Sequence, residues 1–279
     1  MVRINAAKEI PMAAQFAGKV VVITGGGGGI GKAAARRFLE EGADVVLSGT
    51  RREVLEAAQA ELDPAGKRTL IVPGSIHRRD DAQRLVAAAV ERFGGVDVLV
   101  NSTGIFRVTP FEDQTEDHLE EALGSILYPT YWASQAVVAA MRERGGGAIV
   151  NVGSMWAVDA IATTPTSAYS AAQAGRHALT KNLAIELAAD RIRVNTVALA
   201  FVETPAYRRF MDEEEANAVL DAVNGFHPLG RRGQPGDVVE AILFLAGAGA
   251  GWITGTTLPV DGDVLAGRSP ALQPEAAAA

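Results

Sequence analysis

Short apolar runs alternate with amphipathic segments along most of the chain. The first run, Val20–Ile23, is β-branched and ends in glycine, and helical spacing of Ala34, Phe38 and Leu39 follows it. The pattern recurs and predicts strands at Val45–Leu47, Leu70–Val72, Val96–Val100, Ala148–Val152, Ile192–Val197 and Thr257–Val260, and helices at Arg52–Leu62, Asp80–Phe93, Thr115–Arg144, Ser167–Ala189 and Asp237–Ala246. Such alternation predicts an α/β fold, a single-domain doubly wound parallel sheet with helices on both faces.

The domain boundaries follow from where this alternation begins and ends. We expect residues 1–17 to form an N-terminal lead, residues 18–263 the sheet domain, and residues 264–279 a disordered tail rich in alanine and proline. No repeat or linker divides the domain, and 279 residues suffice for one large core. Residues 200–228 follow the sixth strand, so we expect them to form a loop over the ligand-binding edge of the sheet.

A glycine-rich turn, Thr24-Gly25-Gly26-Gly27-Gly28-Gly29-Ile30-Gly31, joins the first strand to the first helix. Gly25 would let the chain leave the strand, Gly29 would let the backbone approach a pyrophosphate, and Gly31 would let the helix pack closely. The helix N-terminus would then offer unpaired amides to the phosphates. A run of glycines can also be a flexible linker, but the flanking buried strand and amphipathic helix favour a Rossmann-type nucleotide site.

Composition and charge exclude several other classes of function. The net charge of −7 argues against binding to nucleic acid or to an anionic membrane. The chain has no cysteine, and its four histidines lack the spacing of a metal pair, so we expect no metal site. No apolar run reaches the length of about 18 residues that a membrane-spanning helix needs, and we expect a soluble cytoplasmic protein.

From Phe16 to Gly262 the order of motifs resembles the short-chain dehydrogenase/reductase superfamily. The matching segments are TGGGGGIG, NSTG, IVNVGS, YSAAQ, IRVN, ETP, HPLGRRG and ITGTTLPVDG. The resemblance implies a nicotinamide cofactor, a small-molecule substrate, and a homotetramer or homodimer formed through the helices at Thr115–Arg144 and Ser167–Ala189.

The resemblance also assigns catalytic roles, and here the chain departs from the family. Ser154 and Tyr169 match the serine that orients the substrate carbonyl and the tyrosine that transfers the proton. Gln173 stands where the family has a lysine that lowers the pKa of that tyrosine, and about Ile126 stands where it has an asparagine. Arg176 lies two helical turns after Tyr169 and could supply the missing charge, or it could be an ordinary packing arginine. If the missing charge limits proton transfer, Gln173→Lys should raise the rate.

The second strand is followed by Ser48-Gly49-Thr50-Arg51-Arg52, with no acidic residue to bind a ribose 2′-hydroxyl. Thr50, Arg51 and Arg52 would suit a 2′-phosphate, which favours NADP over NAD, unless the arginines merely solvate a helix start. By resemblance Thr204 contacts the nicotinamide carboxamide. The further cofactor contacts that the resemblance implies are Thr24, Ile30, Ser75, Ile76, Asn101, Gly104, Tyr169 and Gln173.

The expected substrate wall contains Trp156, Phe201, Tyr207 and Phe210, which suggest an apolar, ring-shaped substrate unless they only pack the loop against the domain. Three hypotheses for the function follow. The first is an NADP-dependent oxidoreductase acting on a carbonyl or alcohol with an atypical tetrad, and the retained binding motifs favour it. The second is a non-redox dehydratase, cyclase or isomerase, and the third is a catalytically inactive nucleotide-binding protein.

Overall fold

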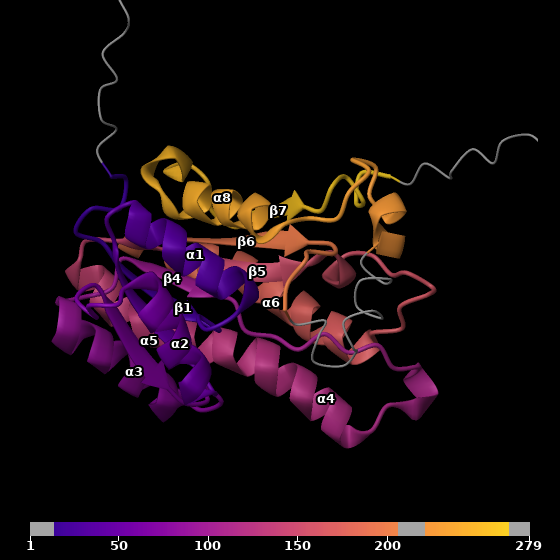
Figure 1. Cartoon of the computed structure of the whole chain (residues 1–279), viewed down its shortest axis with the longest axis horizontal. Helices are drawn as coiled ribbons and strands as arrows, with labels where there is room; N and C mark the ends of the chain where they lie inside the picture. The colour runs from indigo at the N-terminus through magenta and orange to yellow at the C-terminus, as the bar shows by residue number, and fades with distance from the viewer. Residues whose placement is uncertain (1–13, 206–220, 268–279) are drawn as a thin grey trace, which may run out of the picture.

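The computed structural model describes residues 14–205 and 221–267, and within them the strands form one parallel sheet (Figure 1). In their order across the sheet the strands are β3 (Thr69–Pro73), β2 (Asp44–Gly49), β1 (Val20–Thr24), β4 (Val98–Asn101), β5 (Gly147–Ser154), β6 (Ile192–Leu199) and β7 (Thr257–Val260). The chain order reverses between β1 and β4, so the expected doubly wound sheet is confirmed. Ligands bind at this switch point, outside the carboxyl ends of the strands.

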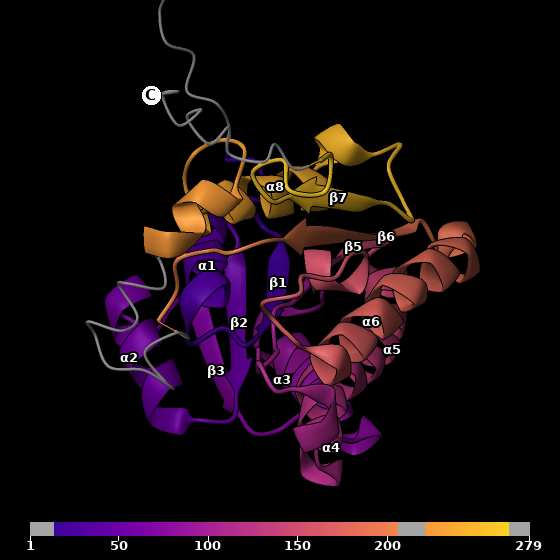
Figure 2. The ribbon, with the colours of Figure 1, turned by 90° about the vertical axis from the view of Figure 1, so that its right-hand side faces the viewer.

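Helices cover both faces of the sheet (Figure 2). One face carries α1 (Gly29–Glu40), α2 (Arg52–Leu62) and α8 (Pro235–Ala246), and the other carries α3 (Arg79–Phe93), α5 (Tyr128–Glu143) and α6 (Ser167–Glu186). The short helix α4 (Glu116–Ala122) precedes α5 and contacts α6.

The apolar run of β1 is explained by these two layers. Val21 and Ile23 face the core beneath α1 and α8, whereas Val22 faces the core beneath α3 and α5, because successive side chains of a strand point to opposite faces. All residues of β1 are buried. A central parallel strand is therefore apolar throughout rather than alternating with polar residues.

The helical region expected over Thr115–Arg144 is interrupted. Between α4 and α5 the chain forms a π-helical turn over Leu123–Leu127, in which the backbone is wider than in an α-helix. The carbonyl oxygen of Ile126 there accepts a hydrogen bond from the Thr130 hydroxyl at 2.6 Å. Such turns occur often at functional sites, and this one lies beside the residues of the candidate active site.

Packing extends slightly beyond the expected domain boundaries. Phe16, in the expected lead, is buried with its ring centroid 4.8 Å from that of Phe38. Val264, at the start of the expected tail, is buried against an aromatic cluster at the other end of the sheet. The packed domain thus includes residues on both sides of the expected limits of 18 and 263. Among the helices that the structure describes, none has the length and apolarity to cross a bilayer.

Candidate active site

The glycine turn after β1 is built so that side chains are excluded from it. Gly25 has a φ of 70°, and a Cβ at this position would lie 2.8 Å from the carbonyl oxygen of Ser102. A Cβ at Gly31 would overlap the carbonyl oxygen of Gly25. The N-cap of α1 is Gly28, which has no side chain to accept from the amides of the first turn. These amides at the positive end of α1 fit a phosphate group.

Two further segments border this turn. Gly29 has a φ of 41°, and a Cβ there would lie 3.3 Å from the side chain of Thr204, so the chain after β6 lies against the glycine turn. On the other side, Thr50 and Arg51 are exposed just before α2. Arg52 is exposed as well and pairs with Glu56 one turn further along α2 at 3.6 Å. Both expected arginines are thus at the surface near the end of β2.

The remaining expected cofactor residues lie at different depths. Ser75 and Gly104 are not buried, whereas Ile76 is buried against the core beneath α3. Asn101 is fully buried, and its amide donates to Ser134 Oγ at 3.2 Å and to Asn151 Oδ1 at 2.9 Å. The Asn101 side chain is therefore held in the core between the sheet and α5, and its amide nitrogen is already used by Ser134 and Asn151.

Ser154, Tyr169 and Gln173 meet at the carboxyl end of β5. The amide of Gln173 donates to Tyr169 Oη at 3.1 Å, and the hydroxyl of Ser154 also bonds to the Tyr169 oxygen. Burial raises the pKa of Tyr169, and these two hydrogen bonds and the charge of Arg176 act in the opposite direction without outweighing it. The expected Ser–Tyr pair is thus assembled around a single phenol oxygen.

Arg176 occupies the space beneath this group and is almost fully buried, at 1% exposure. Its guanidinium donates to Thr130 Oγ1 at 2.9 Å, to Thr103 O at 2.8 Å, to Ile126 O at 3.0 Å and to Val152 O. It also contacts Gln173 Oε1 at 3.5 Å. Burial lowers the pKa of Arg176 to about 10. The side chain joins the π turn, the segment after β4, the end of β5 and the face of α6 that carries Gln173.

His177, the next residue on α6, supports Ser154 from behind. The Ser154 amide donates to His177 Nε2 at 3.3 Å, and a Cβ at Gly153 would overlap this ring. Burial, followed by the charges of Arg176 and Lys181, lowers the pKa of His177 to about 4. The ring is therefore neutral near pH 7, as an acceptor at Nε2 must be. The sequence pattern gave no signal for this role, because a histidine on a helix face carries no spacing signature.

Aromatic side chains form the wall above Tyr169. The rings of Trp156 and Phe201 are buried with centroids 5.0 Å apart, and Phe226 packs against Phe201 at 5.5 Å. Phe106, from the segment after β4, contacts both Trp156 and Tyr169 at about 5 Å. Phe106 lies outside the substrate wall expected from the sequence. Tyr207 and Phe210 lie outside the described residues.

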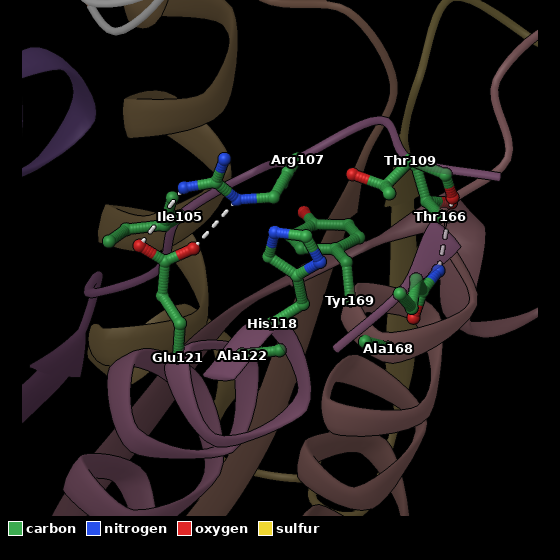
Figure 3. Close-up of a pocket in the computed structure, with 10 residues that line it drawn as sticks. Ile105, Arg107, Thr109, His118, Glu121, Ala122, Thr166, Ala168 and Tyr169 are labelled. Atoms are coloured by element: carbon green, nitrogen blue, oxygen red, sulfur yellow. Dashed lines mark hydrogen bonds and ion pairs between the residues drawn. The ribbon is translucent and has the colours of Figure 1, made fainter. Parts of the chain in front are cut away.

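A shallow pocket opens beside Tyr169, between α4 and the start of α6 (Figure 3). Arg107 and Glu121 form an ion pair across it at 2.8 Å, and the ring of His118 lies in front of Tyr169 in this view. Its lining residues are Ile105, Arg107, Thr109, Gln114, His118, Glu121, Ala122, Thr166, Ala168 and Tyr169. The pocket gives this edge of the site polar and charged walls, in contrast to the aromatic wall.

The fold and the site together define a Rossmann-type α/β protein with a buried tyrosine at the edge of the sheet where a nucleotide binds. The chain belongs to the short-chain dehydrogenase/reductase family. A family model described as enoyl-(acyl carrier protein) reductase matches residues 25–264. Proteins of this family are oxidoreductases that use a nicotinamide nucleotide.

Several relatives match over most of their length. A 1,6-dihydroxycyclohexa-2,4-diene-1-carboxylate dehydrogenase of Pseudomonas putida is 38% identical over 91% of this chain and 96% of its own. A 3alpha-hydroxysteroid dehydrogenase of Mediterraneibacter gnavus is 35% identical over 88% and 96%. Among solved structures, gox2181 has a TM-score of 0.83 at 30% identity and covers 91% of this chain and 98% of its own.

Proposed function

We propose that this chain is an NADP-dependent short-chain oxidoreductase that interconverts an alcohol and a carbonyl on an apolar, cyclic substrate. The observation that carries the proposal is the convergence of Ser154 and Gln173 on the Tyr169 oxygen. This oxygen lies at the edge of the sheet where the glycine turn offers a phosphate cradle. A proton-transferring group and a nucleotide cradle at one edge are what alcohol oxidation requires.

In this proposal the nucleotide supplies or accepts the hydride, and the chain's own residues bind it and move the proton. The backbone of Gly25–Gly31 would hold the pyrophosphate, and Thr204, which lies against Gly29, would hold the carboxamide. Ser154 orients the substrate oxygen. Tyr169 donates its proton to a carbonyl oxygen during reduction and accepts it back from the alcohol during oxidation.

The preference for NADP rests on Arg51 and Arg52. Both are exposed at the start of α2, and Ser48-Gly49-Thr50 before them provides no carboxylate to repel a 2′-phosphate. The ion pair of Arg52 with Glu56 weakens its share, because the guanidinium is already partly neutralised. Arg51 is therefore expected to contribute more of the preference.

The choice of a cyclic substrate rests on the aromatic wall of Phe106, Trp156 and Phe201, in which the partly exposed Phe106 ring offers an apolar contact and the two buried rings support it. Two of the relatives reported above are named for substrates with rings, a dihydroxycyclohexadiene carboxylate and a hydroxysteroid. A flat ring stacked on this wall would bring its hydroxyl or carbonyl toward Tyr169.

The proposal is tested by following the reduced-nicotinamide absorbance with a panel of cyclic ketones and alcohols. We expect turnover with NADP(H), loss of turnover in Tyr169→Phe, and unchanged turnover in the matched control Tyr131→Phe, which keeps the apolar ring that α5 exposes in the single chain. Product formation without any change in the coenzyme would instead support a dehydratase, cyclase or isomerase. Gln173 and Ile126, at the positions of the family's lysine and asparagine, keep that alternative open.

We also propose that the protein assembles as a homotetramer or homodimer through α5 and α6. Tyr131 on α5 and Ile185 on α6 are large apolar side chains exposed to solvent in the single chain. Trp252 and Phe244, near β7 and on α8, are exposed on a second surface. Two separate apolar surfaces are what a tetramer with two-fold axes buries.

A further inference from the structure

Arg176 is a buried cation whose contacts are all electrically neutral. Its acceptors are backbone carbonyl oxygens, the Thr130 hydroxyl and the Gln173 amide oxygen. Within residues 14–205 and 221–267, no carboxylate lies within ion-pair distance of it. Burying a charge without a counter-charge is costly, even when carbonyl dipoles offset part of the cost. Among the described residues, the group beside Arg176 that can become an anion is the phenol of Tyr169, which Arg176 reaches through the amide of Gln173.

The guanidinium fixes the orientation of the Gln173 amide. A guanidinium has donors only, so the amide atom that faces Arg176 must be the oxygen Oε1. The amide nitrogen Nε2 must then face Tyr169, where it donates to Oη at 3.1 Å. A phenol oxygen that receives an N–H donor is stabilised as the phenolate. Without Arg176 the amide could turn over and accept the phenol proton, which would stabilise the neutral phenol instead.

We propose that Arg176, acting through the Gln173 amide, supplies the positive charge that stabilises the phenolate of Tyr169, in place of a lysine at position 173. This inference deepens the proposed function and rests on it for its catalytic consequence. Arg176 touches neither substrate nor cofactor in this scheme, so it is a positioning residue. The carbonyl oxygen of Ile126, which belongs to the π turn, helps to hold the guanidinium in place. It accepts a hydrogen bond from Arg176 Nη2 at 3.0 Å.

The other charged groups around Tyr169 do not replace this arrangement. Arg107 and Glu121, across the pocket that Tyr169 lines, neutralise each other in a bidentate ion pair. His118 lines the same pocket, and its Nδ1 accepts from the backbone amide of Thr115 at 3.2 Å. Behind the site, His177 is neutral near pH 7. Arg176 is thus the cation whose effect reaches the phenol oxygen of Tyr169, through the amide of Gln173.

A purely structural role for Arg176 is the alternative, and the chain offers a matched comparison. Arg193 is also partly buried, and its guanidinium donates to the carbonyl oxygens of Leu245, Ala246 and Gly247. Arg193 lies on β6 and joins it to the end of α8, with no tyrosine among its partners. Removing either arginine leaves buried carbonyl oxygens without a donor and should destabilise the fold. Only the removal of Arg176 should change the titration of Tyr169.

The test replaces the four tyrosines of the full chain by difluorotyrosine and follows their titration by ¹⁹F NMR, without substrate or coenzyme. The ring fluorines make the phenol more acidic, so that the pH midpoint of its titration falls in the range in which the protein stays folded. Tyr169→Phe assigns the resonance. We expect the Tyr169 midpoint to rise by about one pH unit or more in Arg176→Met and in Gln173→Met. It should rise less in Arg176→Lys, which keeps the charge, and should not move in Arg193→Met.

An unmoved Tyr169 midpoint in Gln173→Met, or in a folded Arg176→Met, would overturn the inference. If Arg176→Met fails to fold, Gln173→Met still overturns it when its midpoint does not move. The outcome separates this inference from the proposed function. A shifted midpoint in a protein that turns over no coenzyme would uphold the charge relay and reject the redox activity. Coenzyme turnover with an unmoved midpoint would uphold the activity and reject the relay.

Discussion

His177 makes the stability of this protein sensitive to mild acid. Its ring is 8% exposed and accepts the Ser154 amide at Nε2, so the folded state requires the neutral imidazole. Burial is the main reason that its pKa falls to about 4, against about 6.5 in an unfolded chain. The folded state therefore binds fewer protons than the unfolded state between these two values. The stabilisation is fully present above about pH 6.5 and is lost as the pH falls toward 4.

The magnitude follows from the two pKa values. A difference of about 2.5 units corresponds to about 3 kcal/mol over the whole range, of which about 2 kcal/mol is lost between pH 7 and pH 5. The assay is urea denaturation of the wild type and of His177→Gln at these two pH values. Subtracting the two proteins cancels the titration of all other groups that the substitution leaves unchanged, including His227, whose pKa burial also lowers.

We expect the stability advantage of the wild type over His177→Gln to shrink by about 2 kcal/mol on going from pH 7 to pH 5. A change of less than about 0.5 kcal/mol would mean that His177 is not held neutral by the fold, and a change of opposite sign would mean that the cation is the stabilised form. Because the protonated ring cannot accept from Ser154, any activity should fall reversibly over the same range before the protein unfolds.

Three further expectations concern the cofactor and the assembly. NADP(H) should bind more tightly than NAD(H) by about 1–2 kcal/mol in calorimetric titrations, a preference that high salt reduces and that Arg51→Ala with Arg52→Ala largely removes; equal affinities would reject the arginine argument. Gly31→Ala should weaken both nucleotides at least tenfold, because a Cβ overlaps the Gly25 carbonyl; wild-type affinity would show that this turn does not hold the phosphates. Light scattering at micromolar concentration should give a tetramer or dimer, and a monomeric mass would contradict the role given to α5 and α6.

Much of the fold could be predicted from the sequence because the apolar runs of the strands and the helical spacing of apolar residues between them are both strong. The helix expected at Arg52–Leu62 and the strand expected at Thr257–Val260 have those bounds in the structure, and the ends of the other strands differ from expectation by at most two residues. The π turn at Leu123–Leu127 could not be predicted, since its sequence keeps an ordinary helical spacing. The π turn depends on hydrogen bonds that the Ile126 carbonyl oxygen accepts from Thr130, one turn later in the chain, and from Arg176 on α6.

In the candidate site, too, the sequence predicted which residues belong together but not what some of their side chains contact. Sequence motifs predicted that Ser154 and Tyr169 belong to the site, and the structure brings their side chains together. Helical spacing predicted that Arg176 lies on the same face of the helix as Tyr169. The spacing says nothing of what a side chain meets on that face. Whether Arg176 is a surface arginine or a buried one depends on carbonyl oxygens from β4, β5 and the π turn, which become neighbours only when the sheet has formed. The direction of the Asn101 amide could not be predicted for the same reason, because its partner Asn151 lies on β5 and becomes a neighbour only in the folded sheet.

The position of Arg176 reverses the effect that the sequence suggests for Gln173→Lys. Gln173 is 3% exposed and its Oε1 lies 3.5 Å from the guanidinium, so a lysine there would bring a second cation against the first. Two like charges about 4 Å apart repel by about 4 kcal/mol at an effective dielectric constant of about 20, which applies to buried sites in proteins as well. We therefore expect Gln173→Lys alone to lower the free energy of unfolding by about 2 kcal/mol or more, and not to raise the rate. Ala171→Lys, at an exposed position of α6, is the control for a new lysine on this helix.

Gln173→Lys combined with Arg176→Met should cost less stability than the sum of the two single substitutions. The pair then carries one charge again, at the position where the family has its lysine, although the hydrogen bonds of Arg176 are still lost. The two substitutions should be strongly coupled in a double-mutant cycle of stability, by about 1 kcal/mol or more. If Gln173→Lys alone were as stable as the wild type and faster in carbonyl reduction, Arg176 would not be supplying the charge. The lysine and the buried arginine are thus alternative solutions to one electrostatic requirement, and each excludes the other at this distance.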